Sequence, residues 1–120
     1  MHELSLANHL MQIASEQLRQ MEGVRVVGIE LHIGALACVH DRALRSCFAL
    51  ITQGTPLEQA ELRITKIPLT IYCSKCAQVV PLPGISPLRC PRCDTPSNDI
   101  RQGRELDLVS LEIACAADSE

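Results

Sequence analysis

A chain of 120 residues has room for one domain, or for one domain and a small module. Hydrophobic residues make up 47% of it, but only Phe48 and Tyr72 are aromatic, so a core must consist of Leu, Ile and Val. The formal net charge of -3 and the pI near 5.8 exclude a general attraction to nucleic-acid phosphates or anionic membranes. We expect neither a targeting nor a transmembrane segment, and a reducing, cytoplasmic setting.

The chain opens with a predicted amphipathic helix and a strand. In residues 5–22 apolar side chains recur at helical spacing, with Ser5 as a candidate N-cap and Gly23 as a stop. Residues 27–33 alternate strictly between apolar and other side chains, which is typical of a half-buried strand. Its apolar face would consist of Val27, Ile29, Leu31 and Ile33. We expect His32, on the opposite face, to point away from the core.

A second helix and a second strand are predicted next. Asp41 is placed to cap a helix that Gly54 ends, and apolar side chains follow Asp41 at helical spacing. This stripe consists of Leu44, Cys47, Phe48 and Ile51. Residues 61–67 then predict a strand with Leu62 and Ile64 on its apolar face.

Four of the seven cysteines form two Cys-x-x-Cys pairs with thirteen residues between them: Cys73 and Cys76, then Cys90 and Cys93. Each pair places two thiolates on one tight turn, so two facing turns supply the four soft ligands of a tetrahedral zinc site. We therefore predict a structural zinc at these four residues. The segment between the pairs would form a strand at residues 78–82, a turn and a returning strand. So small a module needs the metal to fold, because metal binding contributes on the order of 10 kcal/mol.

Competing interpretations of these cysteines are two disulfides, an iron site of rubredoxin type, and redox-active dithiols. Disulfides need an oxidising compartment, and seven cysteines is an odd number. A redox centre needs one pair beside a βαβ pattern, whereas zinc explains both pairs together. Among the other cysteines, Cys47 is expected to pack as a small hydrophobe, and the role of Cys115 stays open. Cys38 and His40 form the one pattern that would suit a thiol nucleophile.

The last predicted strand covers residues 104–114, and its apolar pattern changes phase midway. Leu106 and Leu108 share one parity, whereas Val109, Leu111 and Ile113 share the other. We interpret it as one strand whose first half closes the zinc module and whose second half returns to the main sheet. The sequence thus predicts an α+β fold, with two helices packed on a small mixed β-sheet in residues 1–67 plus 105–120. Residues 68–104 would be an inserted zinc-ribbon module.

Core packing does not explain the opening residues Met1, His2 and Glu3. The initiator methionine should stay attached, because aminopeptidases remove it mainly before small residues. The α-amine of Met1, with the backbone nitrogen and imidazole of His2, can close adjoining five- and six-membered chelate rings around one metal. Planar nitrogen ligands suit nickel(II) or copper(II). The backbone nitrogen of Glu3, its carboxylate or a water would fill the fourth position.

Four parts of the chain match a known pattern: the opening Met1-His2-Glu3-Leu4-Ser5-Leu6, the strand end Glu30-Leu31-His32-Ile33-Gly34-Ala35, the helix end from Phe48 to Pro56, and both cysteine pairs. Together they resemble the HypA/HybF family of nickel metallochaperones. The resemblance runs over nearly the whole chain in the same order. An opening Met-His-Glu combined with a late four-cysteine site is specific. Ala77 and Asp94, which follow the second cysteine of each pair, stand where Gly is common, and the tail 114–120 runs past the family's expected last strand.

The resemblance implies that His2, with the Met1 amine and the adjoining amides, binds nickel as cargo, and that the four cysteines hold zinc. It also implies work with a nickel-handling GTPase and delivery to the large subunit of nickel-iron hydrogenase; some relatives also serve urease. A homodimer stays open, and we expect no nucleic-acid or membrane partner. We predict a carrier and not an enzyme, because four cysteines close the zinc shell and leave no position for water.

The main alternative is a zinc-ribbon module that binds nucleic acid or another protein. In its favour, residues 68–104 carry more basic than acidic side chains: Lys75, Arg89, Arg92, Arg101 and Arg104 against Asp94 and Asp99. Against it stand the acidic chain as a whole and Tyr72, the only aromatic residue of the module, which leaves no platform on which bases could stack.

Overall fold

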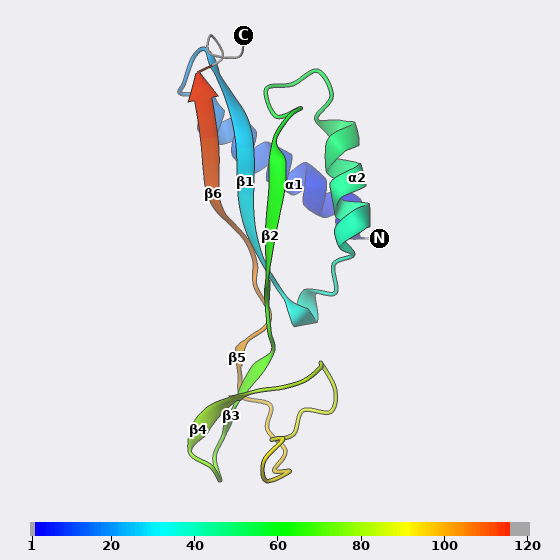
Figure 1. Ribbon diagram of the computed structural model, residues 1–120, viewed down its shortest axis with the longest axis vertical. Helices are drawn as coiled ribbons and strands as arrows, with labels where there is room; N and C mark the ends of the chain where they lie inside the picture. The colour runs from blue at the N-terminus through cyan, green and yellow to red at the C-terminus, as the bar shows by residue number, and fades with distance from the viewer. Residues whose placement is uncertain (1, 116–120) are drawn as a thin grey trace. The chain divides into compact units, whose positions relative to one another are not determined.

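The computed structural model describes the backbone of residues 2–115 and the side chains of residues 3–115 (Figure 1). Along the chain, the helices and strands are α1 (His2–Leu18), β1 (Val24–Gly34), the short 3-10 helix η1 (Ala35–Ala37), α2 (Asp41–Ile51), β2 (Glu61–Ile67), β3 (Thr70–Cys73), β4 (Gln78–Pro81), β5 (Ile100–Gln102) and β6 (Leu106–Cys115). The strands form two three-stranded sheets, in the orders β2-β1-β6 and β4-β3-β5. The fold is therefore α+β with a module of zinc-ribbon type, as the sequence predicts.

The chain divides into two compact units. The first contains residues up to 31, residues 39–63 and the chain from 108 onward, and the second contains residues 32–38 and 64–107. Functional domains at residues 1–67 plus 105–120 and at 68–104 stay a prediction. Within the described part of the chain, no helix is long and apolar enough to cross a membrane.

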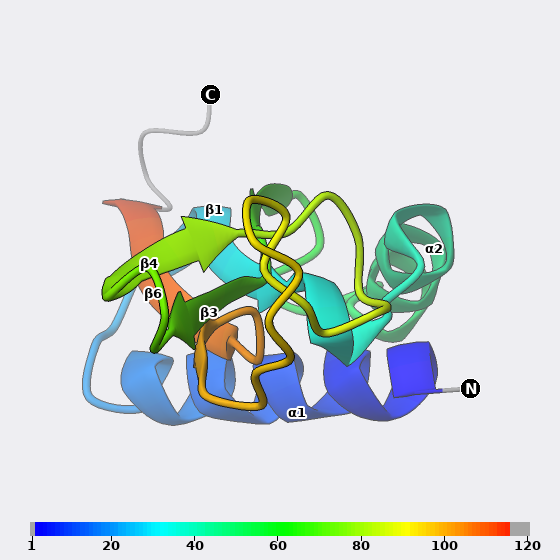
Figure 2. The same ribbon diagram turned by 90° about the horizontal axis from the view of Figure 1, so that it is seen from below.

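The first unit contains both helices and most of the mixed sheet. β1 and β2 run in the same direction and β6 runs opposite to them, while α1 crosses behind the sheet (Figures 1 and 2). Parallel neighbours need a crossover connection, and α2 supplies it between β1 and β2. The core is aliphatic except for Phe48; it includes Leu6, Leu10, Ala14, Val26, Ile29, Leu44 and Phe48.

Both helices differ from the prediction at their ends. α1 begins at His2, before the predicted cap Ser5, and Glu3 stands in its first turn, where an anionic side chain is favourable. It ends at Leu18, and the next residues form a turn rather than continuing to residue 22. The cap of α2 is His40 and not Asp41, because the His40 Nδ1 accepts the Ala43 N–H at 3.2 Å.

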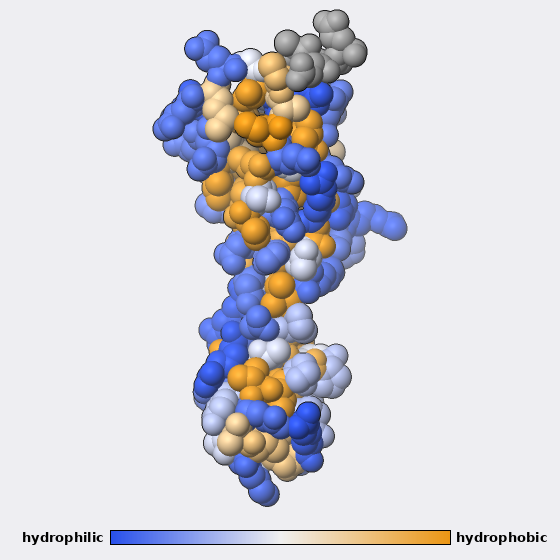
Figure 3. All heavy atoms as spheres, turned by 60° about the vertical axis from the view of Figure 1, so that its left-hand side comes forward, coloured by the Kyte–Doolittle hydropathy of each residue, from blue (hydrophilic) through white to orange (hydrophobic). Residues whose placement is uncertain are grey.

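The strands of the first unit agree with the sequence pattern in part. β2 has the predicted bounds, with Leu62 buried and Ile64 half-buried. In β1 the buried parity changes at Gly28: Val26 is buried, whereas Val27, predicted on the apolar face, is only half-buried. β6 has no fully buried side chain, and apolar side chains gather on the surface on the β6 side of the first unit (Figure 3).

The second unit is built around β3. This strand pairs antiparallel with β4, from Thr70 opposite Pro81 to Cys73 opposite Gln78, and on its other edge with β5. Its small core consists of Leu69, Ile71, Cys73, Val80, Leu82 and Cys90. The predicted returning strand between the cysteine pairs is wrong, because β4 pairs with β3, which ends at Cys73, and no strand follows β4 before β5 in the described chain. Likewise β5, and not the first half of β6, completes the sheet of the module.

Candidate metal centre

Two tight turns position the four cysteines, and each turn is followed by one residue in the left-handed backbone conformation. Cys73 ends β3, Cys76 lies in the turn before β4, and Cys90 and Cys93 flank a second turn. After the second cysteine of each pair the backbone has a positive φ, 55° at Ala77 and 63° at Asp94. Glycine adopts this conformation without strain, and Asp tolerates it better than Ala does. The absence of Gly at these two positions of the sequence therefore does not prevent either turn.

The turns bring the four sulfur atoms of Cys73, Cys76, Cys90 and Cys93 within 4.8 Å of one another. The Sγ atoms of Cys73 and Cys93 are 3.5 Å apart, and those of Cys76 and Cys90 are 3.9 Å apart. A tetrahedral ion with zinc–sulfur bonds of about 2.3 Å would hold its sulfurs about 3.8 Å apart, whereas a disulfide needs about 2 Å. The distances fit a four-thiolate metal site and exclude paired disulfides in this arrangement.

Burial and hydrogen bonding distinguish the four ligands. Cys73 and Cys90 are buried, whereas Cys76 and Cys93 are half-buried. The Cys73 sulfur accepts the backbone N–H of Cys76, and the Cys90 sulfur accepts that of Arg92, each at 3.4 Å. The hydroxyl of Thr95 lies 3.1 Å from the Cys93 sulfur.

These contacts alter the acidity of two thiols in the absence of a metal. Hydrogen bonds from the hydroxyl and backbone of Thr95 lower the pKa of Cys93 to about 6. The hydrogen bond with Cys93, followed by burial, raises the pKa of Cys76 to about 12. One thiolate therefore forms readily while a second negative charge beside it is unfavourable. A divalent cation bound between the thiolates would offset the repulsion between their negative charges, so all four cysteines could be deprotonated together.

Two of the five basic residues of the module, Arg89 and Arg101, lie beside acidic neighbours. Arg101 donates to the Asp99 carboxylate at 2.9 Å and lies 4.7 Å above the ring centre of Tyr72. Arg89 lies 3.8 Å from the carboxylate of Asp94. Because Arg101 lies over the Tyr72 ring, and Arg89 and Arg101 have acidic partners, these contacts weigh against a base-stacking surface at Tyr72.

The N-terminal site is described only in part. Met1 and the His2 side chain lie outside the described residues, so a nickel site at Met1, His2 and Glu3 stays a prediction. Glu3 itself is placed: its Oε2 accepts the backbone N–H of His40 at 2.9 Å. This hydrogen bond is the main reason why the pKa of Glu3 falls to about 2.

The remaining cysteines are separate from the cluster. Cys38 is exposed, with its sulfur 3.9 Å from the Ala35 carbonyl, and Cys115 is exposed at the end of β6. Cys47 is half-buried on α2, in agreement with a packing role. The Nδ1 atom of His40 is engaged as the cap of α2, which does not favour a nucleophilic pair with Cys38.

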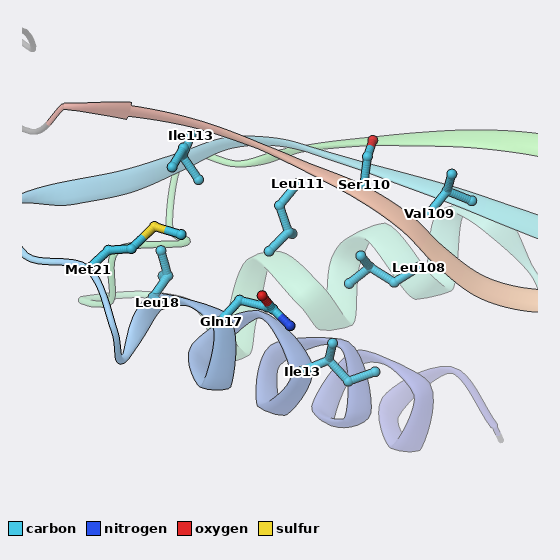
Figure 4. Close-up of a pocket in the computed structure, with 9 residues that line it drawn as sticks. All are labelled: Ile13, Gln17, Leu18, Met21, Leu108, Val109, Ser110, Leu111 and Ile113. Carbon is cyan, nitrogen blue, oxygen red and sulfur yellow. The ribbon is translucent and has the colours of Figure 1, made fainter.

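A groove of about 420 Å³ lies between the second half of α1 and β6, and the sequence pattern did not reveal it (Figure 4). Leu108, Leu111 and Ile113 point toward α1 in this view, and Ser110 points away. The groove is lined by Ile13, Gln17, Leu18, Met21, Leu108, Val109, Ser110, Leu111 and Ile113. None of them is charged or is a His or Cys, so the groove offers no carboxylate, imidazole or thiolate ligand and no acid–base group.

Comparison with known proteins places these features in a family. Residues 1–113 match the model of the family described as "Hydrogenase/urease nickel incorporation, metallochaperone, hypA". The chain is 46% identical to the hydrogenase maturation factor HypA of Chloroflexus aurantiacus over 112 residues, which cover 93% of this chain and 98% of the relative. It is 34% identical to that of Klebsiella pneumoniae over 113 residues, 94% and 99% of the two chains.

A solved structure has the same fold. The solution structure of the Ni metallochaperone HypA from Helicobacter pylori matches with a TM-score of 0.65 and 22% identity, over 96% of this chain and 99% of that chain. The described four-cysteine cluster, the α+β fold and the match over nearly the full length agree with one another. The chain therefore belongs to the HypA family of nickel-incorporation metallochaperones.

Proposed function

We propose that this protein binds Ni(II) at its N-terminus and delivers it during maturation of nickel-iron hydrogenase, while a separate four-cysteine site holds a structural zinc. The observation that carries the proposal is the match of residues 1–113 to a nickel-incorporation family, since it includes both the opening Met-His-Glu and the cysteine pairs. In this proposal the protein is a carrier, and the nickel is its cargo.

The proposed nickel ligands are the α-amine of Met1, the backbone nitrogen and imidazole of His2, and a donor from Glu3. The backbone of α1 supports this set: the N–H groups of a helix's first turn have no acceptor within the helix, so a metal can replace their protons without breaking helical hydrogen bonds. The Glu3 carboxylate already accepts the His40 N–H. We therefore favour the Glu3 backbone nitrogen over its carboxylate as the fourth donor.

The proposed zinc is structural and is held more firmly than the nickel. Sulfur separations of 3.5 and 3.9 Å suit four thiolates around one tetrahedral zinc ion. Such a shell is closed, whereas the nitrogen donors at the chain end are open to competition from a partner. A carrier needs this difference, because its cargo must leave while its fold stays intact.

The proposed partners are a nickel-handling GTPase and the large subunit of a nickel-iron hydrogenase, in a reducing, cytoplasmic setting that keeps the thiols free. A second copy of the chain remains a candidate partner. The family description also names urease, so a urease client is the second destination to test.

The decisive experiment is metal analysis of the untagged, zinc-loaded protein after nickel loading and gel filtration. We compare the parent with His2→Ala and with His9→Ala, which removes an exposed histidine of the same helix. The parent and His9→Ala should each carry one zinc and one nickel, and His2→Ala should carry zinc alone. Nickel retained by His2→Ala would refute the N-terminal site. Nickel affinity should also weaken as the pH falls toward about 6.5, near which an ordinary imidazole is half protonated.

A further inference from the structure

The four sulfur atoms differ in the hydrogen bonds they accept. The buried sulfurs of Cys73 and Cys90 each accept a backbone N–H. The half-buried sulfur of Cys93 has the Thr95 hydroxyl 3.1 Å away. The half-buried sulfur of Cys76 has a different environment: its neighbours are the other cluster sulfurs, with that of Cys90 at 3.9 Å, and no N–H or O–H group in residues 3–115 donates to it.

Metal binding makes this difference chemically meaningful. With an ion bound, all four sulfurs are thiolates, so contacts between sulfurs cannot be hydrogen bonds, and the Thr95 hydroxyl can only donate to Cys93. A hydrogen bond to a thiolate stabilises its charge and makes its lone pairs less nucleophilic. Burial separately blocks the approach of a reagent to Cys73 and Cys90. Cys76 alone combines partial exposure with the lack of a donor.

We propose that Cys76 is the position at which soft carbon electrophiles attack the metal-loaded cluster, and that Thr95 directs the attack there by shielding Cys93. This inference rests on the zinc site proposed above. With iodoacetamide, a lone pair of the Cys76 thiolate forms the sulfur–carbon bond, the carbon–iodine bond breaks and iodide leaves. No oxidant or reductant is needed. The product is an uncharged thioether, which lacks the thiolate charge that a zinc ligand needs, so the cluster opens at the turn between β3 and β4.

The test follows alkylation of the full-length, zinc-loaded protein by limiting iodoacetamide, with peptide mass spectrometry to locate each adduct over time. Cys38 and Cys115 are exposed free thiols and serve as internal references for unprotected reactivity. A chromophoric chelator records zinc release in parallel. Cys76 should be alkylated first among the four cluster cysteines, and zinc release should follow the Cys76 adduct.

Three variants separate the role of the Thr95 hydroxyl from general effects on the module. Thr95→Val keeps the shape and the backbone N–H but removes the hydroxyl donor, and it should raise the alkylation rate at Cys93 up to about tenfold, toward the rate at Cys76. Thr95→Ser keeps the hydroxyl and should preserve the original order. Ser97→Ala is the matched control, because the Ser97 hydroxyl donates to the Tyr72 carbonyl at 2.6 Å and not to a sulfur.

Two kinds of result would overturn the inference. If Cys93, Cys73 or Cys90 reacts before Cys76 in the parent protein, or if zinc-loaded Thr95→Val leaves the Cys93 rate unchanged, the proposed order is wrong. Zinc content is measured first in each variant, and the order in the parent decides the outcome if Thr95→Val fails to hold metal. If all four cysteines react as fast as Cys38, the cluster holds no protecting metal and the proposed zinc site fails as well.

Discussion

The carboxylate of Glu3 accepts a hydrogen bond from the backbone N–H of His40, with 2.9 Å between Oε2 and the nitrogen. This bond joins the first turn of α1 to the N-cap of α2, across 37 residues of sequence. On the other side of the cap, the His40 Nδ1 accepts the Ala43 N–H. The residue next to the proposed nickel ligand His2 is thus tied to the start of the second helix by a charged acceptor.

This relationship predicts a pH-dependent contribution of Glu3 to stability. The His40 N–H is the largest cause that lowers the pKa of Glu3 from 4.5 to about 2 in the folded protein. Because the folded pKa is the lower one, the stabilisation is fully present above pH 4.5 and is lost as the pH falls from 4.5 to about 2. In nickel-free protein, Glu3→Gln should therefore be less stable than the parent at neutral pH, and the difference should shrink below pH 4.5.

Denaturant unfolding of both proteins at each pH measures this difference, and any loss of zinc in acid affects both alike. Glu16→Gln is the control, since it removes a carboxylate of the same helix from an exposed ion pair with Arg19. That variant should stay close to the parent throughout. A Glu3→Gln difference that persists unchanged from pH 7 to the acid limit would contradict the assigned role of the carboxylate.

A second prediction concerns the close approach of Gly34 to Gly103 within the second unit. A Cβ atom at Gly34 would fall against the carbonyl carbon and oxygen of Gly103, which are backbone atoms and cannot rotate away. The Gly34 N–H also donates to the Glu105 carbonyl at 2.8 Å, which fixes this spacing. Gly34→Ala should cost about 3 kcal/mol of unfolding free energy, at the upper end of the usual range for overpacking.

Gly84→Ala is the matched control for that substitution. It lies in the same unit, and a Cβ there would meet no atom within 4 Å. Its unfolding free energy should stay within about 0.5 kcal/mol of the parent value. Equal stability of the two variants in chemical denaturation would show that the backbones at Gly34 and Gly103 can separate without cost.

A third prediction concerns removal of a metal ligand. Cys73→Ala takes one thiolate from the cluster and also truncates a buried side chain of a small core. Because metal binding supplies on the order of 10 kcal/mol in such modules, β3, β4 and β5 should lose protection against hydrogen exchange while α1 and α2 keep theirs. Cys38→Ala, an exposed cysteine outside the cluster, should change neither zinc content nor exchange. A well-dispersed NMR spectrum from residues 68–104 of Cys73→Ala would be incompatible with the proposal.

Local sequence patterns are enough to predict the cysteine cluster and β2. Each Cys-x-x-Cys pair is set by one turn, and β2 is a short alternating run that ends just before Pro68. The start of α1 and the cap of α2 depend instead on a contact between Glu3 and His40, far apart in the chain. A histidine cap also falls outside the usual Ser, Thr, Asp and Asn preference, so Asp41 was the natural but wrong choice.

Strand pairing in the module could not be derived from spacing alone. The thirteen residues between the cysteine pairs are enough for a hairpin. In the structure, however, β4 pairs with one edge of β3 and β5 pairs with the other edge. Pairing of this kind is decided by burial of Ile71 and Val80 in the small core, which no local pattern specifies. The boundary between the two compact units falls after Asp107, within the predicted strand 104–114.

The last prediction follows from Ala77, which is exposed and has a φ of 55°. The left-handed conformation costs an alanine about 1–2 kcal/mol, whereas glycine adds roughly 0.5–1 kcal/mol of chain entropy in the unfolded state. The strain is the larger effect, so Ala77→Gly should stabilise the folded module by about 0.5–1 kcal/mol. Because zinc binding and folding are coupled, the variant should hold zinc a few-fold more tightly in competition with a chelator.

Ala49→Gly is the control: it makes the same exchange at an exposed position inside α2, where it should cost about 1 kcal/mol of helix stability and leave zinc affinity unchanged. Weaker zinc binding by Ala77→Gly would mean that the left-handed turn carries no strain that limits the metal site.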